Sequence, residues 1–259
     1  MKKGFGENKK GQITIFIIIA VIVVVMGILI YMFYPQIATS LGLSPESPQA
    51  YLQNCIEEEI ENSVEEISSQ GGSLNPENSF LYGGKEIEYL CYTNEYYKQC
   101  VVQQPMLKEH IEDEIQNNIN KKVEECFESM EENYQRRGFS TSLKKGAKAI
   151  ELLPKRIIAK FNYTLTLTKG ETERYDSFVV VLNNNLYELI SIANSIISWE
   201  TEYGDAEVTT YMNYYHDLKV EKKKQSDGTT IYIIADRNTE NKFQFASRSL
   251  AWPPGYSIT

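Results

Sequence analysis

An uncharged apolar run from Ile13 to Tyr34 constrains this chain more than any other feature of its sequence. At about 1.5 Å per helical residue, its roughly 22 residues would extend about 33 Å, enough to cross the ~30 Å hydrocarbon layer of a membrane. We therefore expect a transmembrane helix over residues 12–34. The chain after Gln36 is polar enough for a water-soluble domain, which would lie on one side of the membrane.

Charges beside the run predict its orientation. Lysines are frequent before the run, whereas no Lys or Arg follows it before Pro45. Positive flanks stay in the cytoplasm, so residues 1–11 should be a cytoplasmic basic leader and the large domain should be extracellular. A cleaved secretory signal is the alternative, with Ala38-Thr39-Ser40 as its cleavage site. The run is, however, longer than the roughly 7–15 residues of a signal-peptide core.

The four cysteines all follow the apolar run: Cys55, Cys91, Cys100 and Cys126. An even number without a C-x-x-C pair favours two disulfides over a zinc site. Three pairings are possible, and four buried free thiols are the alternative. We favour Cys91–Cys100, which would clamp the short segment between them, together with Cys55–Cys126. Closing the latter loop of about 70 residues would contribute about 4 kcal/mol.

Two amphipathic helices are predicted after a linker over residues 35–49. The first should run from Pro48 to the glycines at 71 and 72, with an apolar stripe of Leu52, Ile56, Ile60, Val64 and Ile67. The second should run from about Pro105 to Tyr134, with a stripe of Leu107, Ile111, Ile115, Ile119, Val123, Cys126, Phe127 and Met130. Both stripes hold or adjoin a cysteine, which favours the Cys55–Cys126 pair. Residues 50–138 should thus form a helical, disulfide-stabilised region.

After Gly138 the apolar period changes from 3.6 to 2, which indicates strands. The expected elements are a strand over Ile157–Leu167, a strand over Arg174–Leu182, a helix over about Leu186–Thr201, a hairpin of Leu218–Lys224 with Thr229–Ala235, and a last strand over Lys242–Ala251. Residues 139–259 should therefore form an antiparallel sheet packed with a helix. The predicted fold class is α+β, with a single transmembrane helix, two long helices and then this sheet.

Composition and motifs argue against several functions. The net charge of -9 disfavours binding to nucleic acid. The acidic segment Glu57–Glu66 is best explained as a solvated helix face, although it could bind cations or a basic partner. The sequence has no phosphate-binding glycine loop, nucleophile elbow or His-Glu-x-x-His motif. His110 and His216 fit surface or boundary positions. We expect no enzyme activity, no catalytic residue, no cofactor and no metal.

Two surface features are candidates for modification or contact. The triplet Asn162-Tyr163-Thr164 fits the N-glycosylation pattern and would place Asn162 on the wet face of its strand. Tyrosines cluster around Tyr92, Tyr96 and Tyr97, where they can form a sugar- or protein-binding surface or fill a modest core. This segment is our candidate for an exposed contact loop.

The stretch Lys9–Phe16 resembles the class III signal of archaeal type IV pilin-like proteins. The resemblance implies that a prepilin-type peptidase cuts between Gly11 and Gln12 and that the apolar helix stays on the mature protein. Phe16 departs from the Glu that many pilins have at this position, which puts filament assembly in doubt. More loosely, Gln70-Gly71-Gly72 and the overall layout are similar to an uncharacterised group of archaeal surface proteins. An ordinary signal anchor is the alternative.

Two functional hypotheses follow from these observations. The first is a pilin-like subunit or minor component of a surface filament, which contacts membrane lipid and copies of itself through the apolar helix. The second is a signal-anchored extracellular binding module, such as a receptor or adhesin, that does not assemble into filaments. Both place the protein in the cell membrane as a single-pass protein with an extracellular C-terminal domain.

Overall fold

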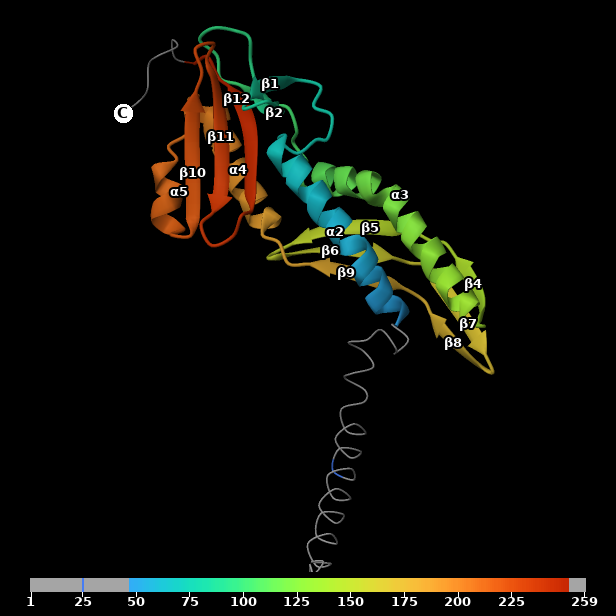
Figure 1. Cartoon of the computed structure of the whole chain (residues 1–259). Coiled ribbons are helices and arrows are strands. Elements are labelled where there is room, and N and C mark those ends of the chain that lie inside the picture. Colours follow the sequence, from blue (N-terminus) through green and yellow to red (C-terminus); the bar gives the residue numbers. More distant parts are fainter. Residues whose placement is uncertain (1–24, 26–46, 252–259) are drawn as a thin grey trace, which may run out of the picture. The chain divides into compact units, whose positions relative to one another are not determined.

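The computed structural model describes Val25 and residues 47–251 (Figure 1). The chain divides after Pro48 into two units, and nearly all of the described residues belong to the second. The predicted leader with its cleavage site after Gly11, and the apolar run other than Val25, lie outside the described residues.

The fold class predicted from the sequence is wrong in two respects, and the first concerns the membrane. Among the described residues, no helix is both long enough and apolar enough to cross a bilayer. The long helices α2 (Pro48–Ser69) and α3 (Leu107–Arg136) are amphipathic, because each buries one face and exposes charged side chains on another. The predicted transmembrane helix therefore has no counterpart in the part of the chain that the structure describes.

Helices α2 and α3 are joined through the two predicted apolar stripes. Every residue named for these stripes is buried. The Cys55–Cys126 disulfide links the two helices, with 6.0 Å between the Cα atoms. Helix α2 ends where the Gly72 N–H donates to the Ile67 carbonyl at 3.0 Å. Gly71 and Gly72 have φ values of 91° and 111°, which L-residues with a side chain rarely adopt.

Residues 140–182 form a three-stranded antiparallel meander that is interrupted once along its length. One sheet contains β4 (Ser140–Lys144), β7 (Thr164–Lys169) and β8 (Glu171–Tyr175); the other contains β5 (Lys148–Leu153), β6 (Arg156–Phe161) and β9 (Phe178–Leu182). The interruptions at 145–147, 162–163 and 176–177 lie opposite one another in the strand register. The predicted strand Ile157–Leu167 is therefore two strands, although buried and less buried side chains alternate across the break as expected.

At the interruption two chain segments of the meander approach each other closely, and α3 packs over them. A Cβ atom on Gly146 would lie 2.0 Å from the Asn162 carbonyl oxygen, so only glycine fits there. The buried Phe127 ring of α3 lies 4.5 Å from the Tyr163 ring and 5.3 Å from the Phe178 ring, measured between centroids. The helix thus covers both sheets at the point where they meet.

The second error concerns the larger sheet, which is mixed and not purely antiparallel. Its order is β1 (Ser79–Tyr82), β2 (Lys85–Tyr92), β12 (Lys242–Arg248), β11 (Thr229–Asp236), β10 (Leu218–Lys224), and β3 (Val101–Val102) also pairs with β2. Strand β12 runs parallel to β2, so two segments far apart in the sequence lie side by side in this sheet (Figure 1). Helix α4 (Leu186–Tyr203) contacts β12, β11 and β2, and the short α5 (Thr209–Tyr214) contacts β10.

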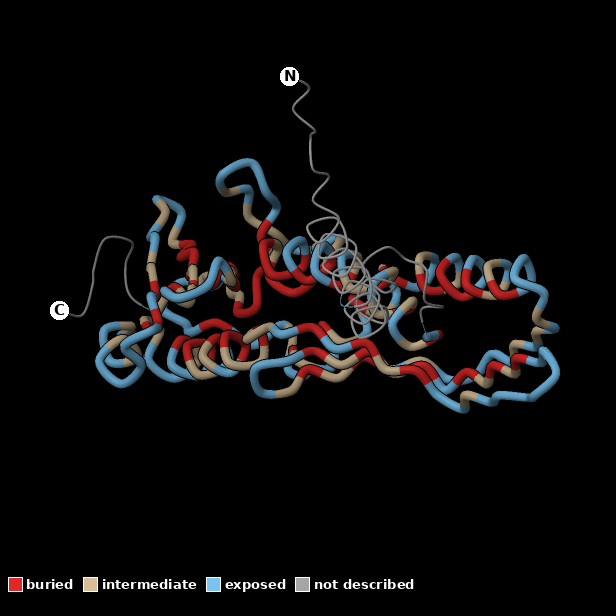
Figure 2. The backbone as a smooth tube through the Cα atoms, turned by 60° about the horizontal axis from the view of Figure 1, so that its bottom comes forward, coloured by how far each residue is buried: buried red, intermediate tan, exposed pale blue. Residues whose placement is uncertain are grey.

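One edge of the meander is covered by glutamine side chains. Gln53 of α2 donates to the Val181 carbonyl at 2.9 Å and accepts from its N–H at 3.1 Å. Gln49 contacts the backbone of Val179 in the same way. These side chains occupy backbone groups of β9 that an edge strand otherwise leaves open to another chain. Figure 2 shows buried positions along the inner faces of the helices and strands and exposed positions at many of the loops.

Candidate functional site

The segment Tyr92–Gln99, which we call the clamped loop, is held at both ends by covalent and hydrogen bonds. Cys91 at the end of β2 and Cys100 before β3 form a disulfide, with 5.3 Å between their Cα atoms. The loop backbone is also bonded to the last residue of β12. Thr93 N–H donates to the Arg248 carbonyl at 2.9 Å, and Arg248 Nη1 donates back to the Thr93 carbonyl at 3.1 Å.

The three tyrosines predicted for contact differ in their surroundings. Tyr96 and Tyr97 are exposed, by 68% and 78%. Tyr92 is half-buried, because its ring packs edge-on against Tyr89 and the Arg248 guanidinium lies 5.7 Å from its centroid. The structure therefore separates a pair of solvent-facing tyrosines from one that packs inward.

Tyr97 has a left-handed backbone, with φ of 61°. For a residue with a side chain this conformation costs about 1–2 kcal/mol, so the surrounding bonds must hold it. The Tyr97 N–H donates to the Leu250 carbonyl at 2.8 Å, and the Leu250 N–H donates to the Lys98 carbonyl at 3.1 Å. The tip of the clamped loop is thus fixed in a form that a free loop would rarely populate.

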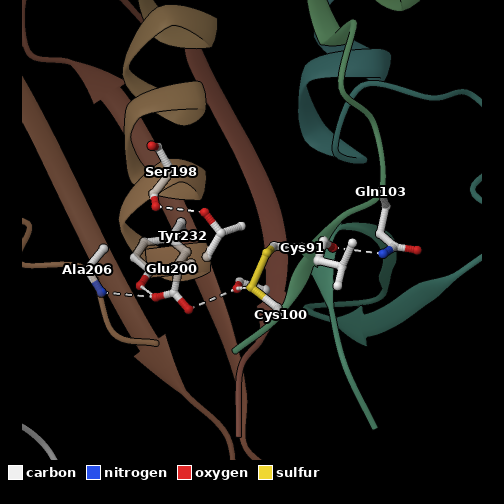
Figure 3. The surroundings of a disulfide bond; sticks show 10 residues. Cys91, Cys100, Gln103, Ser198, Glu200, Ala206 and Tyr232 are labelled. Carbon is white, nitrogen blue, oxygen red and sulfur yellow. Dashed lines mark hydrogen bonds between the residues drawn. A yellow bond between two sulfur atoms is a disulfide. The ribbon is translucent and has the colours of Figure 1, made fainter. Parts of the chain in front are cut away.

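A buried carboxylate lies beneath the clamping disulfide (Figure 3). Glu200 of α4 is only 2% exposed. It accepts hydrogen bonds from the Tyr232 hydroxyl, from the Ala206 N–H at 3.1 Å and from the Ser247 hydroxyl at 3.1 Å. The Ser247 oxygen is in turn 3.7 Å from the Cys100 sulfur. A network of neutral donors therefore connects α4, β11 and β12 with the base of the loop.

The three hydrogen bonds to Glu200 offset the free-energy cost of burying its carboxylate. Burial, reinforced by the negative charge of Glu200 and the hydrogen bond between them, raises the pKa of the Tyr232 hydroxyl well above its ordinary value. Tyr232 therefore stays protonated and donates. Since buried polar networks are stable only when every member is paired, this one fixes the geometry of the sheet below the loop.

A second polar cluster forms where α2 ends. The Ser73 hydroxyl donates to Glu88 at 2.5 Å and lies 2.7 Å from Nε2 of His110. Burial raises the pKa of Glu88, while its bond to Ser73 opposes this rise. Ser73 is itself buried. We interpret the cluster as a tie among α2, α3 and β2.

The other predicted site residues have separate positions. Asn162 is exposed between β6 and β7, at the interruption of the meander, and its glycosylation stays a prediction. The cleavage pair Gly11 and Gln12 lies outside the described residues. His216 is exposed after α5. Within the described part of the chain, no group of three or more His, Cys, Asp or Glu side chains is arranged to hold a metal ion.

No protein-family model, curated protein or solved structure matches this chain. We therefore infer its function from the residues of the folded unit alone.

Glu200 was not predicted as a site residue, although the sequence contains a signal for it. The buried face of α4 includes Ala193, Ile196 and Ile197, and Glu200 is the next position in the same phase. A glutamate on a buried stripe must find donors, so this position could have been identified as a buried polar site. Its partners Tyr232 and Ser247 lie on distant strands and could not have been found by local spacing.

Proposed function

We propose that this protein is an extracytoplasmic binding module that recognises another protein through the clamped loop. The observation that carries the proposal is the display of Tyr96 and Tyr97 on a loop fixed by a disulfide and by hydrogen bonds to residues 248–250.

Two exposed tyrosine side chains on an ordered loop are well suited to bind a protein. Tyr side chains offer large apolar faces with few rotatable bonds, and they are enriched at protein interfaces. A loop that is already ordered loses less conformational entropy on binding, so more of the contact energy appears as affinity. Exposed apolar side chains continue beyond the loop at Val101 and Met106, which extends the surface available to a partner.

The disulfides support a location outside the cytoplasm. Both disulfides join cysteines within one folded unit, and among the described residues no cysteine is free. Such bonds persist in oxidising compartments and are rare in the cytosol. Exposure at the cell surface is therefore part of the proposal.

Site-specific photo-crosslinking tests the contact surface. A photoreactive phenylalanine analogue is placed at Tyr97, and separately at the exposed Lys121 of α3 as the matched control. In cells that express the full chain, we expect one dominant crosslinked partner from position 97 and none from position 121. The Tyr96→Ser change should weaken that product. The same products from both positions, or none from position 97, would contradict the proposal.

The filament-subunit hypothesis stays a prediction. It depends on Gly11, Gln12 and the apolar run, and no described residue bears on these features except Val25.

A further inference from the structure

A groove separate from the clamped loop lies between α4, α5 and the start of β10. Its volume is about 630 Å³, within the range of small-ligand and side-chain pockets. Three tyrosines line it, Tyr187, Tyr214 and Tyr215, and Tyr214 is 80% exposed. Aromatic rings that remain open to solvent beside an apolar floor can contact an incoming group with their faces.

The chain around the groove is held in place by hydrogen bonds. The Tyr211 hydroxyl of α5 lies 2.8 Å from the Ser195 hydroxyl of α4. The Tyr215 N–H donates to the Tyr211 carbonyl at 2.8 Å, and the Arg237 N–H donates to the Asp217 carbonyl at 2.7 Å. The segment that carries the tyrosines is therefore ordered without a ligand.

Charge on the groove is predominantly negative. Three acidic residues line it, Glu188, Asp217 and Asp236, together with two basic residues, Lys155 and His216. Acidic groups that outnumber basic ones beside exposed aromatic rings favour a cationic guest, because ring faces and carboxylates both attract positive charge.

Two of these carboxylates are oriented by neutral groups. Asp236 accepts from the Asn185 side-chain amide at 2.6 Å and from the Asn238 N–H at 2.8 Å. Glu188 accepts from the Lys155 backbone N–H at 3.0 Å. Neutral donors fix the position of a carboxylate without cancelling its charge, so the negative field remains available to a ligand.

We infer that this groove binds an arginine- or lysine-bearing segment of a protein partner, with the cationic side chain against Tyr214 and Tyr215 and near Asp217. Planar guanidinium stacks on aromatic rings and pairs with carboxylates, which makes arginine the better guest. The inference adds a second site to the proposed binding module.

A peptide pair tests the inference directly. The probe is a fluorescein-labelled peptide of alternating arginine and serine, and its matched control carries citrulline, the neutral isostere, at each arginine. Binding to the purified full chain is followed by fluorescence anisotropy. We expect citrulline to weaken binding by about tenfold or more and salt near 0.5 M to weaken the arginine peptide.

Protein variants then locate the binding. Asp217→Asn and Tyr214→Ala should each weaken the arginine peptide by about three- to tenfold, since each removes one attraction to the cation. The matched control is Glu58→Gln on the exposed face of α2, which should change binding by less than about twofold.

Three results would overturn the inference: equal binding of the two peptides, an equal loss in Glu58→Gln, or no binding of the arginine peptide to the wild-type protein. Crosslinking from Tyr97 is measured separately in the Asp217→Asn variant. If the groove fails and the loop does not, that crosslink persists, so the two proposals fail independently.

Discussion

The Glu200 carboxylate accepts a hydrogen bond from the Tyr232 hydroxyl in the core beneath the clamping disulfide. Replacing Glu200 by Ala leaves the Tyr232 hydroxyl, the Ser247 hydroxyl and the Ala206 N–H without their acceptor. We expect a loss of about 3–5 kcal/mol in the free energy of unfolding, measured by urea denaturation. Glu200→Gln keeps one carbonyl acceptor and should lose less. The exposed Glu202→Ala is the control, with a change within about 0.5 kcal/mol, and equal losses at positions 200 and 202 would contradict the role of the network.

Acid should weaken the contact between α3 and the meander at Glu124. Burial raises the pKa of this carboxyl, but hydrogen bonds from Lys145, Lys148 and Tyr163 outweigh it and lower the pKa from 4.5 to about 2. Because the pKa of this carboxyl is lower in the folded state, Glu124 stabilises the fold at pH values above its ordinary pKa. This contribution is lost as the pH falls from about 4.5 towards 2.

The variant Glu124→Gln measures this contribution. We expect it to be less stable than the wild type by about 1–2 kcal/mol near neutral pH, allowing for solvent screening. The difference should shrink when the unfolding free energies are compared at about pH 3. A difference that does not depend on pH would argue that the charge of Glu124 is unimportant.

Gly146 should tolerate no side chain. The Cβ of alanine would lie 2.0 Å from the Asn162 carbonyl oxygen, so the two strands must move apart. We expect Gly146→Ala to lower the free energy of unfolding by about 2–4 kcal/mol. Gly83 is the control, because a Cβ there has open space and meets only the strain of its φ of 59°. The loss in Gly83→Ala should be about 1 kcal/mol, and a loss as large as that at position 146 would contradict the close approach.

The two disulfides should contribute differently. Cys55 and Cys126 are 71 residues apart and Cys91 and Cys100 are 9 apart, so chain entropy gives the first pair about 4 kcal/mol and the second about 3. Paired Cys→Ala variants and urea denaturation measure both losses. Limited proteolysis should cut the clamped loop faster only in the Cys91→Ala, Cys100→Ala variant. Equal protection of the loop in both variants would show that hydrogen bonds alone order it.

The helices could be predicted well because their signal is local. The stripes from Leu52 to Ile67 and from Leu107 to Met130 are buried as expected, since residues three and four apart share a helix face whatever packs on it. The pairing of Cys55 with Cys126 agrees with the preference derived from these stripes.

Sheet pairing was predicted less well, for a physical reason. The alternation from Ile157 to Leu167 shows which side chains are buried, and this burial pattern continues past Asn162. The hydrogen-bond partners change at Asn162, from β5 to β4, and burial gives no sign of that change. The parallel pairing of β12 with β2 joins segments far apart in sequence, and no local pattern specifies it.

For the candidate sites too, local features could be predicted from the sequence, whereas contacts between distant residues could not. Exposure of Tyr96 and Tyr97 agrees with the predicted contact loop, but the inward packing of Tyr92 depends on Arg248, which lies far along the chain. The groove at Tyr214 and Tyr215 needs α4 and β10 in place, so it could not be found from the spacing of these tyrosines in the sequence.

The thiol state of the protein in its own cells tests the central claim, a disulfide-bonded module outside the cytoplasm. Cells are lysed in denaturant with a thiol-alkylating reagent, and the intact mass is measured before and after reduction. We expect no alkylation of Cys55, Cys91, Cys100 or Cys126 before reduction and alkylation of all four after it. Alkylation of the four cysteines without reduction would place the chain in a reducing compartment and contradict the account.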